Sequence, residues 1–319
     1  MNILVTGACG LVGSHLCDLL LSQGHTVFGL DNLLNGKIEN LPKGVDFIKH
    51  DVEIPLCGNP FLGVDIDRIY HLACPASPVH YQRTPIKTML SSIMGTYNML
   101  ELAYANNARF LYTSSSEVYG NTKNQPISEL QLGEDIDTLA DRSCYVEGKR
   151  ASETLIWNYI KEKELDVRIA RLFNIFGPRM AKDDGRVIAS FMYERPIHIH
   201  GKGEQKRSFT YVTDCVEGLN RLMEYDNPHK PINIGNPNGY ISIKKLAMIM
   251  FELMEEELVE GMDEFCEDCT VVHTADRSDS EVFQRMPDIS EAIYYLKWSP
   301  KVPIIEGLEM TIKEMKNDD

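Results

Sequence analysis

Short apolar runs alternate with longer amphipathic stretches over the first half of the chain. The runs are "NILVT", "TVFGL", "DRIYHLA", "RFLYTSS" and "VRIARLF". Apolar runs of this length predict buried strands, and the stretches between them have helical periodicity. Repetition of this strand-and-helix unit predicts an α/β fold, a doubly wound, mostly parallel sheet with helices on both faces.

The pattern changes after about Leu172. Loop-rich segments such as "NIFGPRMAKDDGR" and "HGKGEQKRSF" come before a further strand at "INIG" and helices near the end. We predict a Rossmann-type NAD-binding domain over 1–172, to which 211–236 returns, and a smaller, loop-rich α/β domain over 173–210 and 237–319. Because ligands of doubly wound sheets lie beyond the carboxyl ends of the strands, these late segments are expected to cover a bound cofactor.

A glycine-rich turn joins the first strand to an amphipathic helix and contains Gly7, Gly10 and Gly13. The missing Cβ atoms permit a tight turn and close approach to a pyrophosphate, which the N–H groups of the helix N-terminus can bind. The second strand ends at Asp31, the distance expected for the acidic residue that hydrogen-bonds an adenosine ribose. Because a carboxylate there would repel a 2′-phosphate, the sequence predicts NAD rather than NADP.

Composition excludes several classes of protein. The 319 residues are 43% apolar and 25% charged, typical of a globular protein, and the net charge of −15 opposes nucleic-acid binding. No apolar run approaches the roughly 20 residues of a membrane span, and the chain enters a strand pattern at once, without a targeting segment. The eight scattered cysteines indicate reduced thiols and a cytoplasmic location. Cys266 and Cys269 form an isolated CxxC that is interpreted as loop, so no metal site is expected.

A pair of residues on a predicted helix suggests proton transfer. Tyr145 and Lys149 in "SCYVEGKRASETLIWNYIKEK" are four residues apart and therefore share one face. A tyrosine with a pKa of about 10 needs roughly 4 kcal/mol of preferential phenolate stabilisation to act as a base near neutral pH. Lys149 and a nicotinamide cation could supply it, and a hydroxyl from the end of the "RFLYTSS" strand would complete the arrangement.

The glycine turn followed by this pair resembles the extended short-chain dehydrogenase/reductase family, whose members remodel nucleotide sugars, over nearly the whole chain. In that family the residues before "VYG" face the sugar, and here they are Ser116 and Glu117. The 4,6-dehydratases have an Asp-Glu pair there. Because Ser116 stands at the Asp position, this chain lacks the acid that a departing hydroxyl needs. Glu117 differs from the small residue usual in 4-epimerases.

The strings "HLACPASP", "SEVYG", "RSCYVEGKR", "GPRM" with "DDGRV", and "QRMPDI" resemble the decarboxylating branch of the family. The resemblance implies conversion of UDP-glucuronate to UDP-xylose through a transient 4-keto intermediate, with NAD used catalytically. Oxidation at C4 makes the C5 carboxylate a β-keto acid, which can lose CO₂. By this resemblance Ser116 hydrogen-bonds the reacting oxygen, Tyr145 is the base tuned by Lys149, and Glu117 and Arg285 bracket the C5 substituent. Glu117 is expected either to help place the carboxylate or to manage the proton that replaces it.

The resemblance also implies the remaining binding residues. The cofactor is expected to contact Asp51, Val52, Leu72, Tyr145 and Lys149. The UDP-sugar is expected to contact Asn174, Arg179, Arg186, Val187 and Arg207. Without the resemblance, Arg285 would be interpreted as the partner of Asp288 in a surface ion pair, and His198 and His200 are interpreted as structural.

Two alternatives stay open. One is a 4-epimerase or 4,6-dehydratase acting on another nucleotide sugar, favoured by a shortened segment over 187–197 and a longer acidic segment over 255–269. The other is a non-catalytic NAD-sensing regulatory protein, which could dispense with the Tyr–Lys pair. The resemblance further implies a homodimer, formed through the Tyr-bearing helix and the helix over 86–107.

Overall fold

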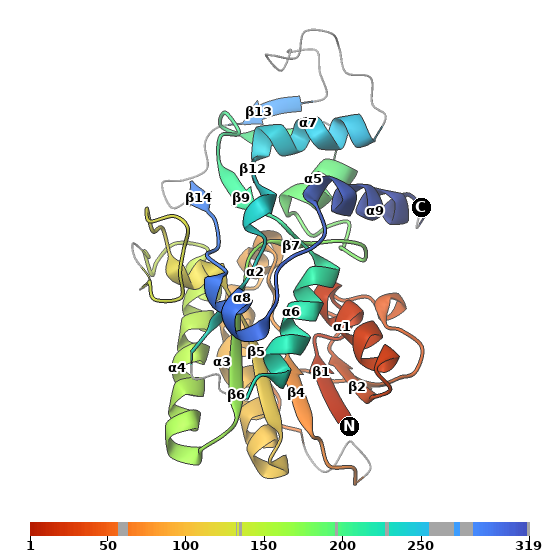
Figure 1. The fold of residues 1–319 in the computed structure, drawn as a ribbon, viewed down its shortest axis with the longest axis vertical. Helices are drawn as coiled ribbons and strands as arrows, with labels where there is room; N and C mark the ends of the chain where they lie inside the picture. The colour runs from red at the N-terminus through yellow and green to blue at the C-terminus, as the bar shows by residue number, and fades with distance from the viewer. Residues whose placement is uncertain are drawn as a thin grey trace.

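The computed structural model describes residues 1–56, 63–131, 133, 136–194, 197–226, 230–254, 271–274 and 283–317. Its centre is a parallel sheet of seven strands in the order β11-β6-β5-β4-β1-β2-β3 (Figure 1). The strands are β1 (Asn2–Thr6), β2 (Thr26–Asp31), β3 (Val45–Lys49), β4 (Arg68–His71), β5 (Arg109–Ser115), β6 (Val167–Leu172) and β11 (Ile232–Ile234). The predicted α/β fold with a doubly wound sheet is confirmed.

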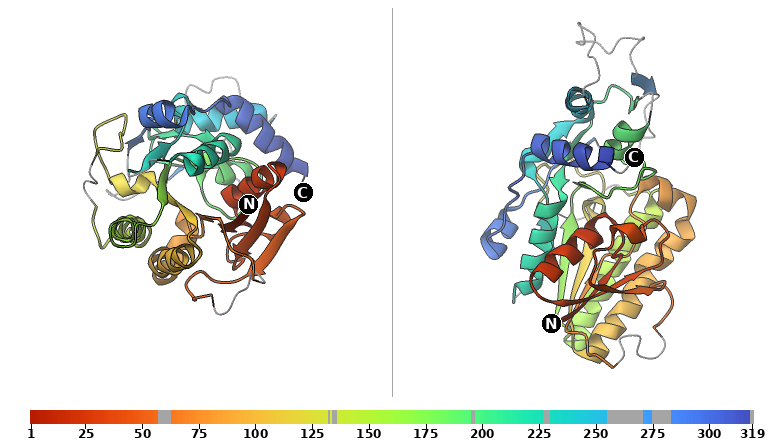
Figure 2. Two further views of the ribbon diagram at one scale, coloured as in Figure 1. Left: turned by 60° about the horizontal axis from the view of Figure 1, so that its bottom comes forward. Right: turned by 90° about the vertical axis from the view of Figure 1, so that its right-hand side faces the viewer.

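Helices cover both faces of this sheet (Figure 2). Successive side chains of a strand point to opposite faces, so Ile3 and Val5 of β1 pack in one apolar cluster and Leu4 packs in another. The first cluster contains apolar residues of α1 (Leu11–Ser22) and α6 (Val212–Glu224). The second contains residues of α3 (Pro85–Asn106) and α4 (Ser143–Lys163). Burial on both faces explains why the strands are continuous apolar runs.

The strand order reverses at β1. From β1 the chain continues to β2 and β3 on one side, and then returns through β4, β5 and β6 on the other. A crevice therefore forms beyond the carboxyl ends of the central strands, where doubly wound folds bind their ligands.

Smaller elements stand above that edge of the sheet (Figure 1). Three short strands form a sheet in the order β12-β9-β14, and β7 pairs with β10 and β8 with β13. Their bounds are β7 (Ile175–Phe176), β8 (Ile197–His200), β9 (Lys206–Ser208), β10 (Thr210–Tyr211), β12 (Tyr240–Ser242), β13 (Val271–Thr274) and β14 (Gln284–Arg285). The accompanying helices are α2 (Pro78–Arg83), α5 (Val187–Tyr193), α7 (Ile243–Leu253), α8 (Ser290–Leu296) and α9 (Ile304–Asn317), with 3-10 turns η1 (Ile38–Asn40), η2 (Ser116–Tyr119) and η3 (Pro237–Gly239).

The sequence analysis did not predict strand β3, and two of the features it singled out lie outside the described residues. β3, with the sequence "VDFIK", lies at the edge of the sheet and is only partly buried, so it has no continuous apolar run to predict it. The CxxC at Cys266 and Cys269 and the acidic segment over 255–269 lie outside the described residues.

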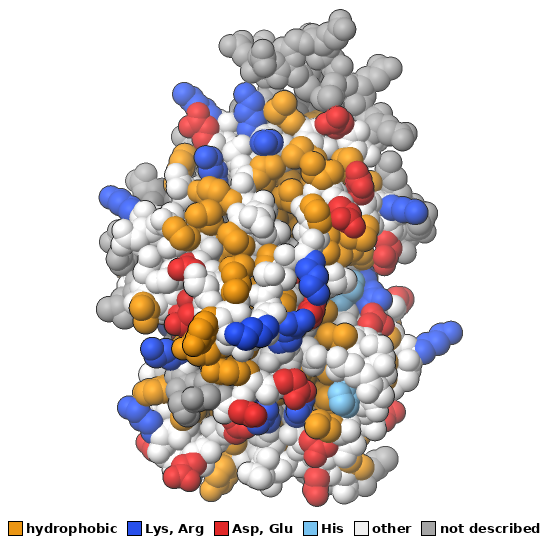
Figure 3. Space-filling model, in the orientation of Figure 1, with side chains coloured by type: hydrophobic (Ala, Val, Ile, Leu, Met, Phe, Trp, Pro, Cys, Tyr) orange, Lys and Arg blue, Asp and Glu red, His pale blue; other side chains and the backbone are white. Residues whose placement is uncertain are grey.

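Within the described part of the chain, every helix is too short or too polar to cross a membrane. On the face drawn in Figure 3, acidic and basic side chains are interspersed.

Candidate active site

A cavity of about 770 Å³ lies over the carboxyl ends of β5 and β6. A smaller cavity of about 210 Å³ adjoins it, and Leu72 lines both. The predicted residues on the wall of the larger cavity are Ser116, Glu117, Tyr145, Lys149, Asn174, Arg186, Val187 and Arg207. Those on the wall of the smaller cavity are Gly7, Gly10, Gly13, Asp31, Val52, Leu72, Arg179 and Arg186. The structure thus separates the predicted residues into two connected groups.

The backbone of the glycine-rich turn packs closely at the smaller cavity. Gly7 has a φ of +71°, and a Cβ there would lie 3.0 Å from the backbone nitrogen of Ala73. A Cβ on Gly13 would lie 2.1 Å from the Gly7 carbonyl oxygen, so α1 can pack this closely against the turn only without a side chain. Asp31 accepts hydrogen bonds from the N–H of Cys9 at 3.0 Å and of Leu33 at 2.8 Å. These features fit a dinucleotide whose pyrophosphate lies at the start of α1.

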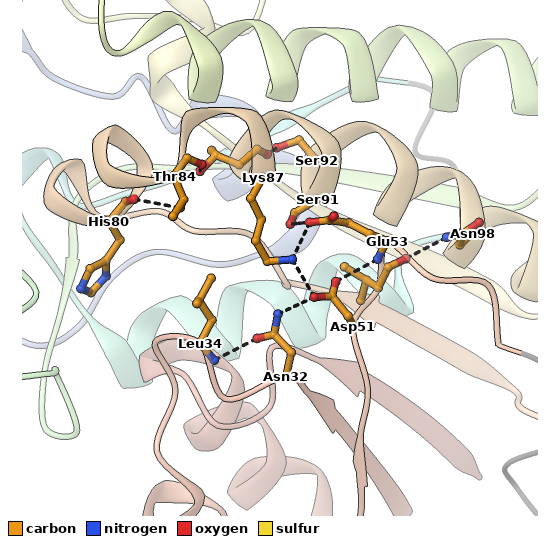
Figure 4. A network of polar contacts seen from close by, with 12 residues as sticks. Asn32, Leu34, Asp51, Glu53, His80, Thr84, Lys87, Ser91, Ser92 and Asn98 are labelled. Carbon is orange, nitrogen blue, oxygen red and sulfur yellow. Dashed lines mark hydrogen bonds and ion pairs between the residues drawn. The ribbon is translucent and has the colours of Figure 1, made fainter.

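Asp51 belongs to a polar network that joins the loop after β3 to helix α3 (Figure 4). The ammonium of Lys87 donates to Asp51 at 2.6 Å and to Glu53 at 2.9 Å, and the amide of Asn32 donates to Asp51 at 3.0 Å. Burial raises the pKa of Asp51, but these hydrogen bonds outweigh it and hold the pKa below its usual value. Lys87 therefore fixes an ionised carboxylate beside the smaller cavity.

Replacing Lys87 by Met is expected to weaken NAD binding about 3- to 10-fold. The substitution leaves the carboxylates of Asp51 and Glu53 near each other without the cation that holds both, so the loop beside the cavity loses its anchor. Isothermal titration with NAD measures the effect, and Lys87→Arg, which retains the charge, serves as the control. Unchanged affinity in Lys87→Met would remove Asp51 from the cofactor site.

Tyr145 and Lys149 lie on the buried face of α4 and point into the larger cavity. The ring of Tyr145 stacks on that of Tyr81 from α2, with 5.3 Å between centroids and 9° between planes. Lys149 donates to the carbonyl of Thr113 at 2.7 Å, and its ammonium lies 5.9 Å from the centroid of the Tyr145 ring. Burial raises the pKa of Tyr145 to about 12, although Lys149 acts to lower it. Burial and Lys149 thus act on the pKa of this phenol in opposite directions.

Ser115, at the end of β5, is a neighbour of the Tyr145 hydroxyl. A hydrogen bond between the side chains of Ser115 and Tyr145 lowers the pKa of the phenol. Ser115 ends β5 and caps η2 by accepting a bond from the N–H of Glu117 at 3.2 Å, whereas Ser116 is the first residue of η2. Both serines line the larger cavity.

Glu117 lies between two arginines. One carboxylate oxygen is 2.5 Å from a guanidinium nitrogen of Arg285, and the other accepts from Arg142 at 2.6 Å. Burial raises the pKa of Glu117, but Arg285 and Arg142 hold it below the usual value. The expected alternative for Arg285 is not found, because Asp288 accepts instead from the N–H of Ser290 at 2.9 Å. Arg142 was missed by sequence reasoning, since an arginine before a helix is usually solvated.

A buried amide holds the segments that carry Glu117 and Arg285. Asn233 of β11 accepts from the hydroxyl of Tyr119 at 2.7 Å and donates to the carbonyls of Ile127 at 2.9 Å and Asp288 at 3.0 Å. Tyr119 belongs to η2, and Asp288 follows β14. The Asn233 side chain therefore links the two segments that bring Glu117 and Arg285 together.

The predicted nucleotide-contacting residues occupy different places. Arg186 lines both cavities and is paired with Asp184 at 2.5 Å. Asn174 donates to the carbonyl of Ser208 at 3.1 Å, which ties it to the strand that carries Arg207. Val187 is the first residue of α5.

Two side chains lie elsewhere than expected. Arg179 pairs with Asp18 at 2.7 Å and lines the smaller cavity, which it shares with Arg186 alone among the predicted substrate contacts. His198, which alternation on a strand suggested to be structural, lines the larger cavity. Neither position could be obtained from local sequence, because both depend on how the loop-rich segments fold over the sheet.

Residues 3–235 match the model of the NAD dependent epimerase/dehydratase family. The chain is 41% identical over 327 residues to UDP-glucuronic acid decarboxylase 1 of Arabidopsis thaliana, covering 99% of this chain and 70% of the relative. It is 39% identical over 326 residues to UDP-glucuronic acid decarboxylase 1 of Xenopus tropicalis, covering 99% and 72%.

Solved structures of similar fold include epimerases. UDP-glucose 4-epimerase of Thermotoga maritima, solved with UDP-glucose, has a TM-score of 0.88 and 28% identity, covering 100% of this chain and 99% of its own. UDP-glucuronic acid 4-epimerase of Bacillus cereus, solved with UDP-glucuronic acid and NAD, has a TM-score of 0.83 and 27% identity, covering 100% of both chains.

Proposed function

Because the chain belongs to the NAD dependent epimerase/dehydratase family, we propose that it is a UDP-glucuronic acid decarboxylase that uses NAD catalytically to convert UDP-glucuronate to UDP-xylose. The observation that carries the proposal is the partly buried carboxylate of Glu117, held between Arg142 and Arg285 on the cavity that also contains Tyr145. Curated relatives of this name match nearly the whole chain.

The smaller cavity fits NAD, since a side chain at Gly7 or Gly13 would fill the space against the backbone. The turn at Gly7, Gly10 and Gly13 would hold the pyrophosphate and Asp31 the ribose. When bound, NAD accepts a hydride from C4 of the sugar and later returns it. The proposal includes an NAD-binding domain over 1–172 with 211–236, and a nucleotide-sugar domain made of the remaining segments.

Side chains of the larger cavity transfer the proton of the C4 hydroxyl and stabilise the negative charge that forms on its oxygen. Tyr145 takes the proton of the C4 hydroxyl, and Ser115 hydrogen-bonds the same oxygen. Once C4 is a ketone, the bond from C5 to the carboxylate breaks, CO₂ leaves, and the electron pair moves into the C4 carbonyl. The C4 oxygen then gains negative charge, which the Tyr145 proton and Ser115 stabilise. C5 takes up a proton in place of CO₂.

The low pKa of Glu117 favours one of its two expected roles. A carboxylate held ionised by Arg285 and Arg142 is a poor proton donor, but it is a firm anchor for cationic side chains. Glu117 is therefore assigned to placing the C5 carboxylate through the arginines beside it, and the proton for C5 comes from another source.

The two alternatives have less support. The two epimerases reported above are 28% and 27% identical to this chain, below the 39% to 41% of the decarboxylases. A regulatory protein without chemistry has no use for Tyr145 and Lys149, which this chain buries beside the larger cavity.

Product analysis tests the proposal. Purified protein is incubated with UDP-glucuronate and NAD, the nucleotide sugars are measured by mass spectrometry, and released CO₂ is captured. Decarboxylation with internal reduction gives a product lighter by one CO₂, without net NADH. The same CO₂ with accumulating NADH means that the ketopentose is released. A product of unchanged mass and no CO₂ would replace the proposal with a 4-epimerase.

The pH dependence of turnover reports the state of Tyr145. Because its pKa is raised and the phenolate is the active base, kcat is expected to rise with pH up to the pKa of Tyr145 in the complex. Lys149→Met removes a lowering influence, so the profile should move to higher pH by about one to two units. Lys149→Arg, which keeps the charge, is the control. An unshifted profile in Lys149→Met would contradict the tuning role.

The proposal includes a homodimer and a cytoplasmic location. α3 and α4 pack against each other, and α3 exposes Ile86, Leu90, Met94 and Tyr97, spaced three or four residues apart. The five cysteines that the structure describes are free thiols, which fits a reducing compartment. Sedimentation velocity at micromolar concentration is expected to give a dimer, and Leu90→Asp a monomer. A monomeric parent protein would refute the dimer.

A further inference from the structure

We propose that Tyr112 of β5 is a positioning residue, whose ring holds the ammonium of Lys149 in place beside Tyr145. The inference rests on the proposed function, because it assigns a further residue to the proton transfer at C4. The wall of neither cavity includes Tyr112, so it acts through Lys149 and not on the substrate.

The ammonium of Lys149 rests on the ring of Tyr112. Its nitrogen lies 4.6 Å from the centroid of that ring and 5.9 Å from the centroid of the Tyr145 ring. It also donates to the carbonyl of Thr113 at 2.7 Å, so two consecutive residues of β5 hold it. Lys149 and Tyr112 are only 3% and 1% exposed. A ring face attracts a cation within about 6 Å, and more strongly where water is excluded. Ring and carbonyl together therefore restrain a charge carried on a flexible side chain.

The ring holds the ammonium without adding a negative charge. Two carboxylates of neighbouring segments, Glu153 and Glu117, pair with arginines instead, at 2.6 Å and 2.5 Å. Burial raises the pKa of the Tyr112 phenol well above its usual value, so this ring is neutral near pH 7. A carboxylate beside Lys149 would oppose a phenolate at Tyr145, whereas a neutral ring leaves the whole positive charge to stabilise it.

Tyr112 packs against a buried histidine. The ring of His71 on β4 lies 5.8 Å from that of Tyr112, with 31° between the planes. Burial lowers the pKa of His71 to about 3, and Lys149 acts in the same direction, so the imidazole is neutral. Its Nδ1 lies 2.8 Å from the hydroxyl of Thr6, the residue before Gly7. The packing that holds Lys149 is thus continuous with the turn proposed to bind the pyrophosphate.

Several other groups influence the titration of Tyr145. The titratable and charged side chains that face the Tyr145–Lys149 pair are Tyr81 of α2, His71 of β4, Cys74 after β4, Glu117 of η2 and Arg186 before α5. The test variants change none of these, so a shift in the titration of Tyr145 reports on the ammonium.

Titration of the Tyr145 phenol tests the inference without turnover. Ultraviolet difference absorbance follows phenolate formation in NAD-loaded protein, and each variant is compared with the same protein carrying Tyr145→Phe. Tyr112→Leu removes the ring and is expected to move the midpoint to higher pH by about 0.5 to 1 unit. Tyr112→Phe keeps the ring and should restore the parent midpoint. In Tyr112→Leu, kcat at neutral pH should fall about 3- to 10-fold with an unchanged KM for UDP-glucuronate.

Two controls separate positioning from loss of packing. Phe110→Leu removes an equally buried ring from the same face of β5 and should leave the midpoint unchanged. In a Lys149→Met background, Tyr112→Leu should cause no further shift, because the ring then has no ammonium to hold. Thermal unfolding verifies that each variant is folded.

Three results would overturn the inference. They are an unshifted midpoint in folded Tyr112→Leu, an equal shift in Phe110→Leu, and the same shift in the Lys149→Met background. If Tyr112→Leu does not fold, Tyr112→Met decides by the same criteria.

The inference and the proposed function can fail separately. If the parent protein releases no CO₂ but the midpoint moves in Tyr112→Leu, Tyr112 still positions Lys149 and the decarboxylase proposal is wrong. If the parent releases CO₂ and the midpoint stays in place, only the inference is overturned.

Discussion

Replacement of Tyr145 by Phe is expected to lower kcat for CO₂ release about 10³- to 10⁴-fold, with NAD affinity nearly unchanged. The substitution removes the oxygen that accepts the C4 proton, a contribution of the size known for general bases. It keeps the ring that stacks on Tyr81, so the cavity should retain its shape. Initial rates of CO₂ release and titration with NAD measure the two quantities.

The same helix offers a matched control for this variant. Tyr159 is also buried on α4, but its hydroxyl donates to Glu101 at 2.5 Å, away from the cavity. Tyr159→Phe should therefore retain the parent kcat. If Tyr145→Phe kept more than about a tenth of the activity, Tyr145 could not be the base. Loss of turnover with intact NAD binding also excludes a purely regulatory protein, provided that the parent is active.

Simultaneous replacement of Glu117 and Arg285 by Ala is expected to reduce CO₂ release about 10²- to 10³-fold. The double variant removes the anchor of Arg142 and the charge behind it, so the C5 carboxylate is no longer held while C4 is oxidised. Oxidation at C4 does not require these residues, so transient NADH should still form. Stopped-flow absorbance of NADH, together with captured CO₂, separates the two steps.

Single variants serve as the stability controls for this experiment. Removing one partner of a buried ion pair leaves an uncompensated charge and costs about 3 to 5 kcal/mol of stability. Arg285→Ala and Glu117→Ala should each unfold at a lower temperature than expected from lost packing alone, and the double variant should recover part of the difference. Full decarboxylation by a folded double variant would exclude the roles assigned to both residues.

The fold was predictable where burial imposes a pattern. The strands from β1 to β6 that lie inside the sheet are covered on both faces, so each appears as an apolar run. β3 lies at the edge and has charged residues at its second and fifth positions, which matches no such run. Strands β7, β10 and β14 have two residues each, too few for any periodicity. Their pairing depends on segments distant in sequence.

Some residues of the site could be predicted from local spacing, and others come together only through contacts between distant segments. Tyr145 and Lys149 were found because helical spacing places them together, and Gly7 and Gly13 because a turn before a helix requires them. The contact between Glu117 and Arg285 joins η2 to β14, and only resemblance to known proteins suggested it. The choice between Ser115 and Ser116 depends on where β5 ends, a boundary that single sequences define poorly.

The partly buried cluster of Arg142, Glu117 and Arg285 has a consequence for the evolution of this fold. Apolar side chains of similar volume in place of a buried ionic cluster are often neutral or stabilising, so selection for stability alone would not retain these three charges. A descendant freed from the reaction would drift toward an apolar filling of the same space. Among proteins of this fold, loss of the cluster should therefore mark lineages in which chemistry at C5 has been abandoned.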